Sequence, residues 1–440
     1  MTSKESLELA RSAVDQARKQ GANQVAANVF SERSIEAEVR AGKLEKLQES
    51  ARHGLSLAIY LEQRYSSHST NDLRHDSLAR FIGEAVAMTR YLAQDSFRSL
   101  PDPKYYAGQE KRDLNLVDPG YEKIDTAERV RLAKAIKAAA LAQSDKIISV
   151  TAGYGDSFSQ NVKVHSNGFE GEETGTSFSI SAEVTVKDDQ GGHPEDYAYA
   201  YTRHLKDLPE VASIGRESAQ RALKKIGQRK IASGRYDLLV ENRSASRVFG
   251  ALVGAMTGRA LQQKSSFLDG MLGQAVASEK LTVSEDPFVP AGQGSRLFDA
   301  EGIAARKRAV IDQGVLKTYY IDSYYGRKLG VEPTTGRPSN LVFDLGDKDL
   351  AAMVQGISKG ILVSNFIGGN SNGTTGDFSF GIMGFYIENG ALRQPVNEMN
   401  ISGNLKDLWK QLAATGNDPF PYGGWRIPTL HFTGIQFSGL

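Results

Sequence analysis

The sequence has no cysteine among its 440 residues. This absence excludes disulfide bonds, thiolate ligands for a metal ion and a cysteine nucleophile. The sequence also has no apolar run of the roughly 18 residues that a membrane-spanning helix requires, and no apolar segment typical of a signal peptide. We therefore expect a cytoplasmic protein that does not enter a membrane.

A surplus of either charge is missing as well. The 53 basic and 52 acidic residues leave a net charge of +1, which projects no broad positive field toward nucleic acid. Hydrophobic residues make up 40% of the chain and charged residues 24%, as in ordinary globular proteins. Nucleic acid is therefore not an expected partner.

The chain is longer than the length at which a single hydrophobic core keeps growing, so several domains are expected. Runs of predicted strands are interrupted by single helices without regular β-α-β alternation, which indicates an α+β protein with mixed or antiparallel sheets. The pattern predicts an N-terminal α+β domain at 1–105, a linker at 106–121, a middle α+β domain at 122–230 and a β-rich C-terminal domain at 231–440.

The C-terminal domain contains a predicted helix over residues 242–263 with an unusual glycine pattern. Gly250, Gly254 and Gly258 follow one another at four-residue spacing, and each internal glycine costs a helix roughly 1 kcal/mol relative to alanine. Two explanations stay open. Another backbone packs closely against the glycines, or the glycines form a smooth groove floor or subunit contact.

Other segments offer little recognisable chemistry. No two of the seven histidines lie within five residues of each other, so no pair on one helix can chelate zinc. Alternating tyrosines at 197, 199 and 201 are typical of a cross-strand aromatic ladder. The glycine-rich run 368–381 lacks the lysine of a phosphate-binding loop, but four of its polar side chains are candidates for lining a peptide groove: Asn370, Asn372, Thr374 and Thr375.

Four blocks in the second half carry a resemblance to the TldD/PmbA family, and most closely to its PmbA/TldE branch. They read SFLDGMLGQAVASEKLTVSEDP, GSRLFDAEGIAARKRAVIDQGVLKTYYIDSYYGRKLG, TGDFSFGIMGFYIENG and ISGNLKDLWKQLAATGND. Catalytic members of this family carry a His-Glu-x-x-x-His motif on the helix that corresponds to residues 243–263. The resemblance places Phe249, Gly250 and Gly254 at the first His, the Glu and the second His of that motif.

The resemblance implies a degenerate metallopeptidase helix. In the family, the TldD subunit binds zinc through the two motif histidines and a cysteine near its C-terminus, and the Glu serves as general base. Phe249 offers no ligand atom, the two glycines have no side chain, and the corresponding C-terminal segment, PYGGWRIPTLHF, has no cysteine. The chain is therefore expected to be non-catalytic, with no catalytic residue and no metal or other cofactor of its own.

The same resemblance implies a role and a partner. It suggests a TldE/PmbA-type subunit of a zinc metallopeptidase that processes unfolded peptides, with the zinc on a TldD-type catalytic partner. Older members were named modulators of DNA gyrase, a role that the balanced charge does not support. Two alternatives stay open: a stand-alone, homodimeric peptide-binding or regulatory adaptor, and an enzyme whose chemistry has moved to scattered His and Asp residues.

Overall fold

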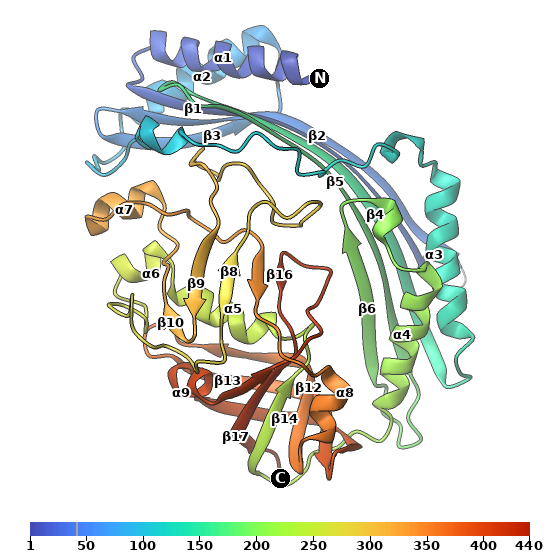
Figure 1. Ribbon diagram of the computed structural model, residues 1–440. Helices are drawn as coiled ribbons and strands as arrows, with labels where there is room; N and C mark the ends of the chain where they lie inside the picture. The colour runs from blue at the N-terminus through green and yellow to red at the C-terminus, as the bar shows by residue number, and fades with distance from the viewer. Residues whose placement is uncertain (41–42) are drawn as a thin grey trace.

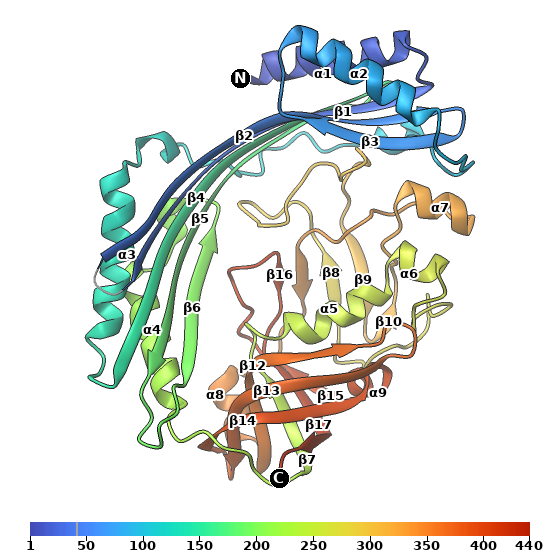
Figure 2. The same ribbon diagram turned by 180° about the vertical axis from the view of Figure 1, so that it is seen from behind.

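Six long antiparallel strands form an arched sheet that covers a C-terminal body (Figures 1 and 2). The computed structural model describes residues 1–40 and 43–440. The strand order is β3-β2-β1-β4-β5-β6, with β1 (Gln24–Arg40), β2 (Lys43–Leu61), β3 (Arg64–Thr70), β4 (Ile147–His165), β5 (Glu170–Val186) and β6 (Glu195–Thr202). Strands from the segments predicted as separate N-terminal and middle domains are neighbours here, since β1 pairs with β4. The domain boundaries themselves stay a prediction.

Four helices cover the convex face of the arch (Figures 1 and 2). At one end lie α1 (Ser3–Lys19) and α2 (His75–Thr89), and at the other α3 (Thr126–Leu141) and α4 (Val211–Lys224). Each pair buries apolar side chains against the strands beneath it. A buried ion pair fastens α3 to β4, with Arg129 Nε 2.6 Å from Asp156 Oδ2. The helices leave the concave face of the sheet turned toward the body.

The C-terminal body has two sheets. A mixed sheet has the order β14-β13-β12-β7-β17-β15, and a smaller one has the order β10-β9-β8-β11-β16. The strands are β7 (Gly234–Val240), β8 (Val283–Glu285), β9 (Arg308–Asp312), β10 (Val315–Leu316), β11 (Leu341–Phe343), β12 (Lys359–Ser371), β13 (Asp377–Glu388), β14 (Ala391–Asn404), β15 (Leu412–Thr415), β16 (Trp425–Arg426) and β17 (Leu430–Ser438). The helices are α5 (Ser246–Ala255), α6 (Gly258–Gln262), α7 (Ser323–Leu329), α8 (Leu350–Gln355) and α9 (Leu405–Lys410). Side chains of α5 and of both sheets belong to one large apolar core.

The predicted helix over 242–263 is wrong in one respect, because the structure divides it into α5 and α6. Thr257 between them has extended backbone angles, φ −80° and ψ 143°, and its side chain accepts a hydrogen bond from the N–H of Ala260. The N–H of Gly258 donates to the carbonyl of Tyr320 at 2.8 Å. A threonine cap and pairing with a distant segment therefore replace the helical hydrogen bonds here.

Asn167–Gly168 lies in the hairpin turn between β4 and β5, and Asn-Gly is a pair that often forms a type I′ turn. Here only Gly168 has a positive φ, of 101°, so the turn is not type I′. Across residues 1–40 and 43–440, no helix is both long and apolar enough to cross a membrane.

Candidate functional site

Phe249, which the resemblance places at the first His of the motif, is part of the core. Its side chain is fully buried, and its ring centroid lies 4.9 Å from that of Phe343, 5.6 Å from Trp409 and 6.1 Å from Trp425. All three neighbours meet it edge to face, a favourable arrangement for aromatic pairs. Phe249 thus fixes α5 to the body and presents nothing to solvent.

The other two positions face open space. Ser246, Gly250 and Gly254 recur every four residues and form one row along α5. A Cβ on Gly250 would meet only Trp425, at 3.7 Å, and a Cβ on Gly254 would meet nothing within 4 Å. On Gly258, by contrast, a Cβ would lie 2.9 Å from the Cβ of Tyr325. Close packing therefore explains Gly258 alone, while the surroundings of Gly250 and Gly254 favour a smooth surface.

The residues at these positions do not fit a zinc ion. Phe249 has no donor atom, and glycine has no side chain to donate one. Phe249 points into the core while Gly254 is exposed, as expected for helix positions five apart, which are rotated by about 140°. Within the part of the chain that the structure describes, no group of three or more His, Cys, Asp or Glu residues is placed to hold a metal ion.

A cavity of about 400 Å³ opens beside the first turn of α5, and we call it the aromatic cavity. Ser246 of α5 lines it together with the rings of Tyr199, Phe420 and Trp425. The ring of Tyr199 meets that of Phe420 edge to face at 5.4 Å, and burial raises the pKa of the Tyr199 phenol. Ser339 also lines the cavity, and its buried hydroxyl has no hydrogen-bond partner among the described residues.

The tyrosine row on β6 is not the cross-strand ladder that the sequence predicts. Opposite Tyr197, Tyr199 and Tyr201, β5 presents Glu183, Ser181 and Ser179, none of them aromatic. The rings of Tyr197 and Tyr199 instead stack on each other along the strand, with centroids 6.1 Å apart. The row therefore faces the body, since Tyr199 also contacts Phe420 there.

Arg243, which precedes α5, fastens this edge of the arch to the body. Its guanidinium lies over the ring of Tyr197, 4.9 Å from the centroid, and donates to the carbonyl oxygen of Tyr197 at 2.8 Å. Gln293 donates to the carbonyl of Tyr201 at 3.3 Å. Two outward carbonyls of the edge strand are thus occupied, which protects it against pairing with another strand.

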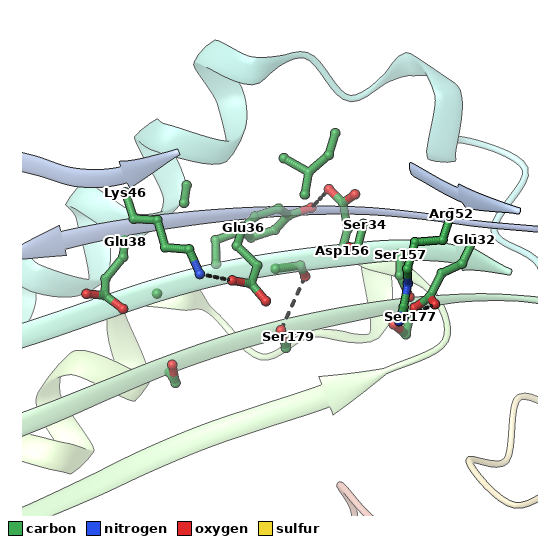
Figure 3. Close-up of a pocket in the computed structure, with 16 residues that line it drawn as sticks. Glu32, Ser34, Glu36, Glu38, Lys46, Arg52, Asp156, Ser157, Ser177 and Ser179 are labelled. Atoms are coloured by element: carbon green, nitrogen blue, oxygen red, sulfur yellow. Dashed lines mark hydrogen bonds and ion pairs between the residues drawn. The ribbon is translucent and has the colours of Figure 1, made fainter. Parts of the chain in front are cut away.

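The concave face of the arch carries a hollow of about 490 Å³ lined by small polar side chains (Figure 3). We call it the serine trough, because its floor consists of glycine and serine: Gly153, Gly155 and Ser157 of β4 opposite Ser181, Ser179 and Ser177 of β5. A Cβ on Gly155 would lie 2.8 Å from the hydroxyl of Ser179, so a larger residue at position 155 would require Ser179 to move. Acidic residues of β1 border the trough, and two of them pair with β2, Glu36 with Lys46 and Glu32 with Arg52 (Figure 3).

The four groove candidates from the glycine-rich run lie at the exposed end of the β12–β13 hairpin. Asn372 accepts hydrogen bonds from the N–H groups of Thr374 and Thr375 at 2.9 and 3.3 Å, and the Thr375 hydroxyl donates to Asp377 at 2.6 Å. Asn372 and Thr375 therefore shape the turn, whereas Asn370 is exposed on β12. None of the four lines the aromatic cavity or the serine trough, and their role in a groove stays a prediction.

Sequence reasoning missed the walls of the aromatic cavity. Phe420 and Trp425 lie about two hundred residues from Tyr199 in the chain, and nothing in their local sequence distinguishes them from core aromatics. Only the C-terminal segment 421–432, singled out for its missing cysteine, pointed toward this place, because Trp425 stands beside Gly250.

Comparison with known proteins gives consistent matches along the chain. Residues 119–226 match the PmbA/TldA metallopeptidase central domain, and residues 233–439 match the PmbA/TldA metallopeptidase C-terminal domain. Metalloprotease PmbA of Escherichia coli O157:H7 is 31% identical over 388 residues, which cover 87% of this chain and 85% of that protein. A PmbA homolog of Haemophilus influenzae is 29% identical and covers 92% of this chain and 90% of its own.

Solved structures share the whole fold. A protein from Bacteroides thetaiotaomicron, named as a modulator of DNA gyrase, superposes with a TM-score of 0.97 at 43% identity and full coverage of both chains. TldE from Thermococcus kodakarensis gives a TM-score of 0.87 at 20% identity, covering 98% of this chain and 100% of that one. At this lower identity, the match shows a common fold alone.

Proposed function

Because this chain belongs to the PmbA/TldD family of metallopeptidases, we propose that it is the metal-free, TldE-type subunit of a heteromeric zinc peptidase. A TldD-type partner holds the zinc and the general base, and this chain supplies interface and groove surface. The substrate is an unfolded peptide, and the complex acts in the cytoplasm. This chain has no catalytic residue of its own.

The observation that carries the proposal is the open row of Ser246, Gly250 and Gly254. Two helix positions that the family resemblance assigns to the Glu and the second His have no side chain, and an added Cβ would clash with nothing at either of them. Internal glycines weaken a helix, so a surface function gives a reason for them that packing does not. A bare helix face lets a peptide or a partner's backbone approach closely.

The serine trough and the aromatic cavity support a peptide substrate. Both face the space between the arch and the body. Small hydroxyls and glycines accept many sequences, because recognition then falls on the peptide main chain. Hollows of about 400 to 490 Å³ suit a few residues of an extended chain better than a folded domain, which supports an unfolded substrate. The net charge of +1 gives no support to nucleic-acid binding.

A reconstitution assay tests the proposal. This chain and a TldD-type chain from the same genome are purified separately and mixed, and hydrolysis of an unfolded peptide is followed. We expect activity in the mixture that neither chain shows alone. The variant Gly254→Trp adds a bulky ring at an exposed position where an added Cβ meets nothing within 4 Å, and it should reduce that activity while the chain stays folded. Leu141→Trp, at an exposed residue of α3, is the matched control.

Two results would count against the proposal. If the activity of the TldD-type chain is the same with and without this chain, then this chain is not its subunit. If this chain forms a homodimer that binds unfolded peptide and ignores the TldD-type chain, the stand-alone adaptor replaces the subunit role.

A further inference from the structure

A second cavity of about 400 Å³ continues the serine trough along the same two strands. The floor pairs of the trough end at Ser157 and Ser177, and the next pairs, Ser159 with Gly175 and Asn161 with Glu173, line this cavity. From Gly153 to Asn161 the floor covers eight steps of β4, or roughly 26 Å at about 3.3 Å per residue. An extended peptide of about eight residues thus spans both hollows.

Arg203 lies at this end of the floor, directly after β6. Its side chain belongs to the same face as the tyrosine row and lies against Gly175, where a Cβ would be 2.9 Å from Nη1. The guanidinium donates to two backbone carbonyls, Thr176 at 3.3 Å and Gln293 at 2.9 Å. Its buried Nε has no partner among the described residues. Glycine at position 175 therefore leaves room for the guanidinium of Arg203. The two groups that accept hydrogen bonds from this guanidinium are uncharged.

The other charged groups of the cavity are already engaged. Arg112 pairs with Glu110 at 3.0 Å, and Arg296 lies 3.6 Å from Glu285. Of the acidic groups, Glu173 pairs with Lys163 at 3.3 Å, and Asp113 accepts from the N–H of Asn115 at 2.7 Å.

The third carboxylate, Glu172, accepts hydrogen bonds from Ser3, Gln160 and Thr174. Arg203 is thus the lining arginine for which the described residues supply no carboxylate. Burial lowers its pKa, which is the expected cost of a desolvated charge without a counterion.

We propose that Arg203 binds a carboxylate of the peptide that lies along the serine trough. This proposal rests on the function proposed above. It adds a preference for a carboxylate to the serine trough, which otherwise contacts only the peptide main chain. A guanidinium binds a carboxylate through parallel N–H donors, and the carbonyls of Thr176 and Gln293 take only one of the two N–H groups on each of Nη1 and Nη2. The carboxylate comes from the peptide C-terminus or from an Asp or Glu side chain.

Peptide binding measured by fluorescence anisotropy tests the proposal, on this chain alone and on its mixture with the TldD-type chain. Three labelled unfolded peptides share one sequence: a form without acidic residues that ends in a free carboxylate, its C-terminal amide, and an amidated form with one internal Asp. We expect the free-acid form or the Asp form to bind roughly tenfold more tightly than the neutral amide, a typical gain for a charge-assisted pair. Which of the two binds tightly identifies the source of the carboxylate.

Substitutions of Arg203 test whether this residue causes the preference for a carboxylate. Arg203→Gln should abolish it, Arg203→Lys should retain part of it, and Arg306→Gln, at an exposed arginine outside the cavity, should leave it intact. If Arg203 only held the carbonyls of Thr176 and Gln293, the Gln variant would lower stability and keep the preference.

Equal binding of all three peptides by the unaltered protein overturns the carboxylate site and leaves the proposed function standing. Failure of both preparations to bind any of the peptides, together with no gain of activity on mixing, overturns both.

Discussion

At the scale of single residues, the least expected group is Glu301, beside α7. It accepts hydrogen bonds from the N–H and the hydroxyl of Ser323 at 2.7 and 2.6 Å, but it forms no ion pair with a cation among residues 1–40 and 43–440. Burial, with the like charges of Asp299 and Asp322, raises the pKa of Glu301 to about 7. It lines a cavity between the arch and the body together with His165, whose pKa burial lowers to about 4.

The variant Glu301→Gln should therefore change the pH dependence of stability. The native protein keeps a proton on Glu301 that the unfolded chain, with a pKa near 4.5, loses. The free energy of unfolding thus falls as the pH rises from 4.5 to 7, by about 3 kcal/mol. Relative to the unaltered protein, the variant should gain stability across this window and keep the gain above pH 7.

Urea unfolding at a series of pH values measures this difference. The contribution of His165 has the opposite sign, since its stability is lost as the pH falls from 6.5 to 4. It is present in both proteins and cancels in the comparison. A difference that stays constant from pH 4.5 to 8 would contradict the assignment to Glu301.

At the scale of elements, glycine has different surroundings in the two short helices α5 and α6. Gly250 lies on the open row, whereas Gly258 lets α6 approach α7 through Tyr325. The sequence groups the two residues in a single stripe, and the structure separates them.

Alanine at each glycine tests this separation. Gly250→Ala should raise the free energy of unfolding by up to about 1 kcal/mol, because it removes the backbone entropy of glycine from a helix. Gly258→Ala should lower it by about 1–3 kcal/mol, because its Cβ would overlap Tyr325. Denaturant unfolding of both variants gives the values. Destabilisation of equal size at both positions would show that Gly250 is packed rather than open.

The elements also show how far sequence reasoning reaches. The α+β class and the family resemblance are confirmed, and the sequence predicts helical structure within residues 242–263, where α5 and α6 lie. The break at Thr257 was missed, since it depends on pairing with Tyr320, more than sixty residues away. The role of Arg203 could not be read from sequence either, because a missing counterion becomes visible only when burial is known.

At the scale of the whole molecule, a network of buried charges connects the arch to the body. Arg221 of α4 makes two hydrogen bonds with Glu241, which follows β7, at 2.6 and 2.8 Å. Asp196 of β6 lies 3.1 Å from Lys225 and 3.3 Å from Arg221. Asp196 is buried, so its carboxylate depends on these two cations for neutralisation. The pair of Arg221 and Glu241 therefore connects α4 of the arch to the segment between β7 and α5.

The most direct test of the central claim is the zinc content of this chain and of its TldD-type partner, purified separately from cells grown with zinc and measured by mass spectrometry of the elements. The account predicts stoichiometric zinc on the partner and none on this chain, because α5 presents no donor atom at its motif positions. Stoichiometric zinc on this chain, with peptide hydrolysis by the chain alone, would contradict it.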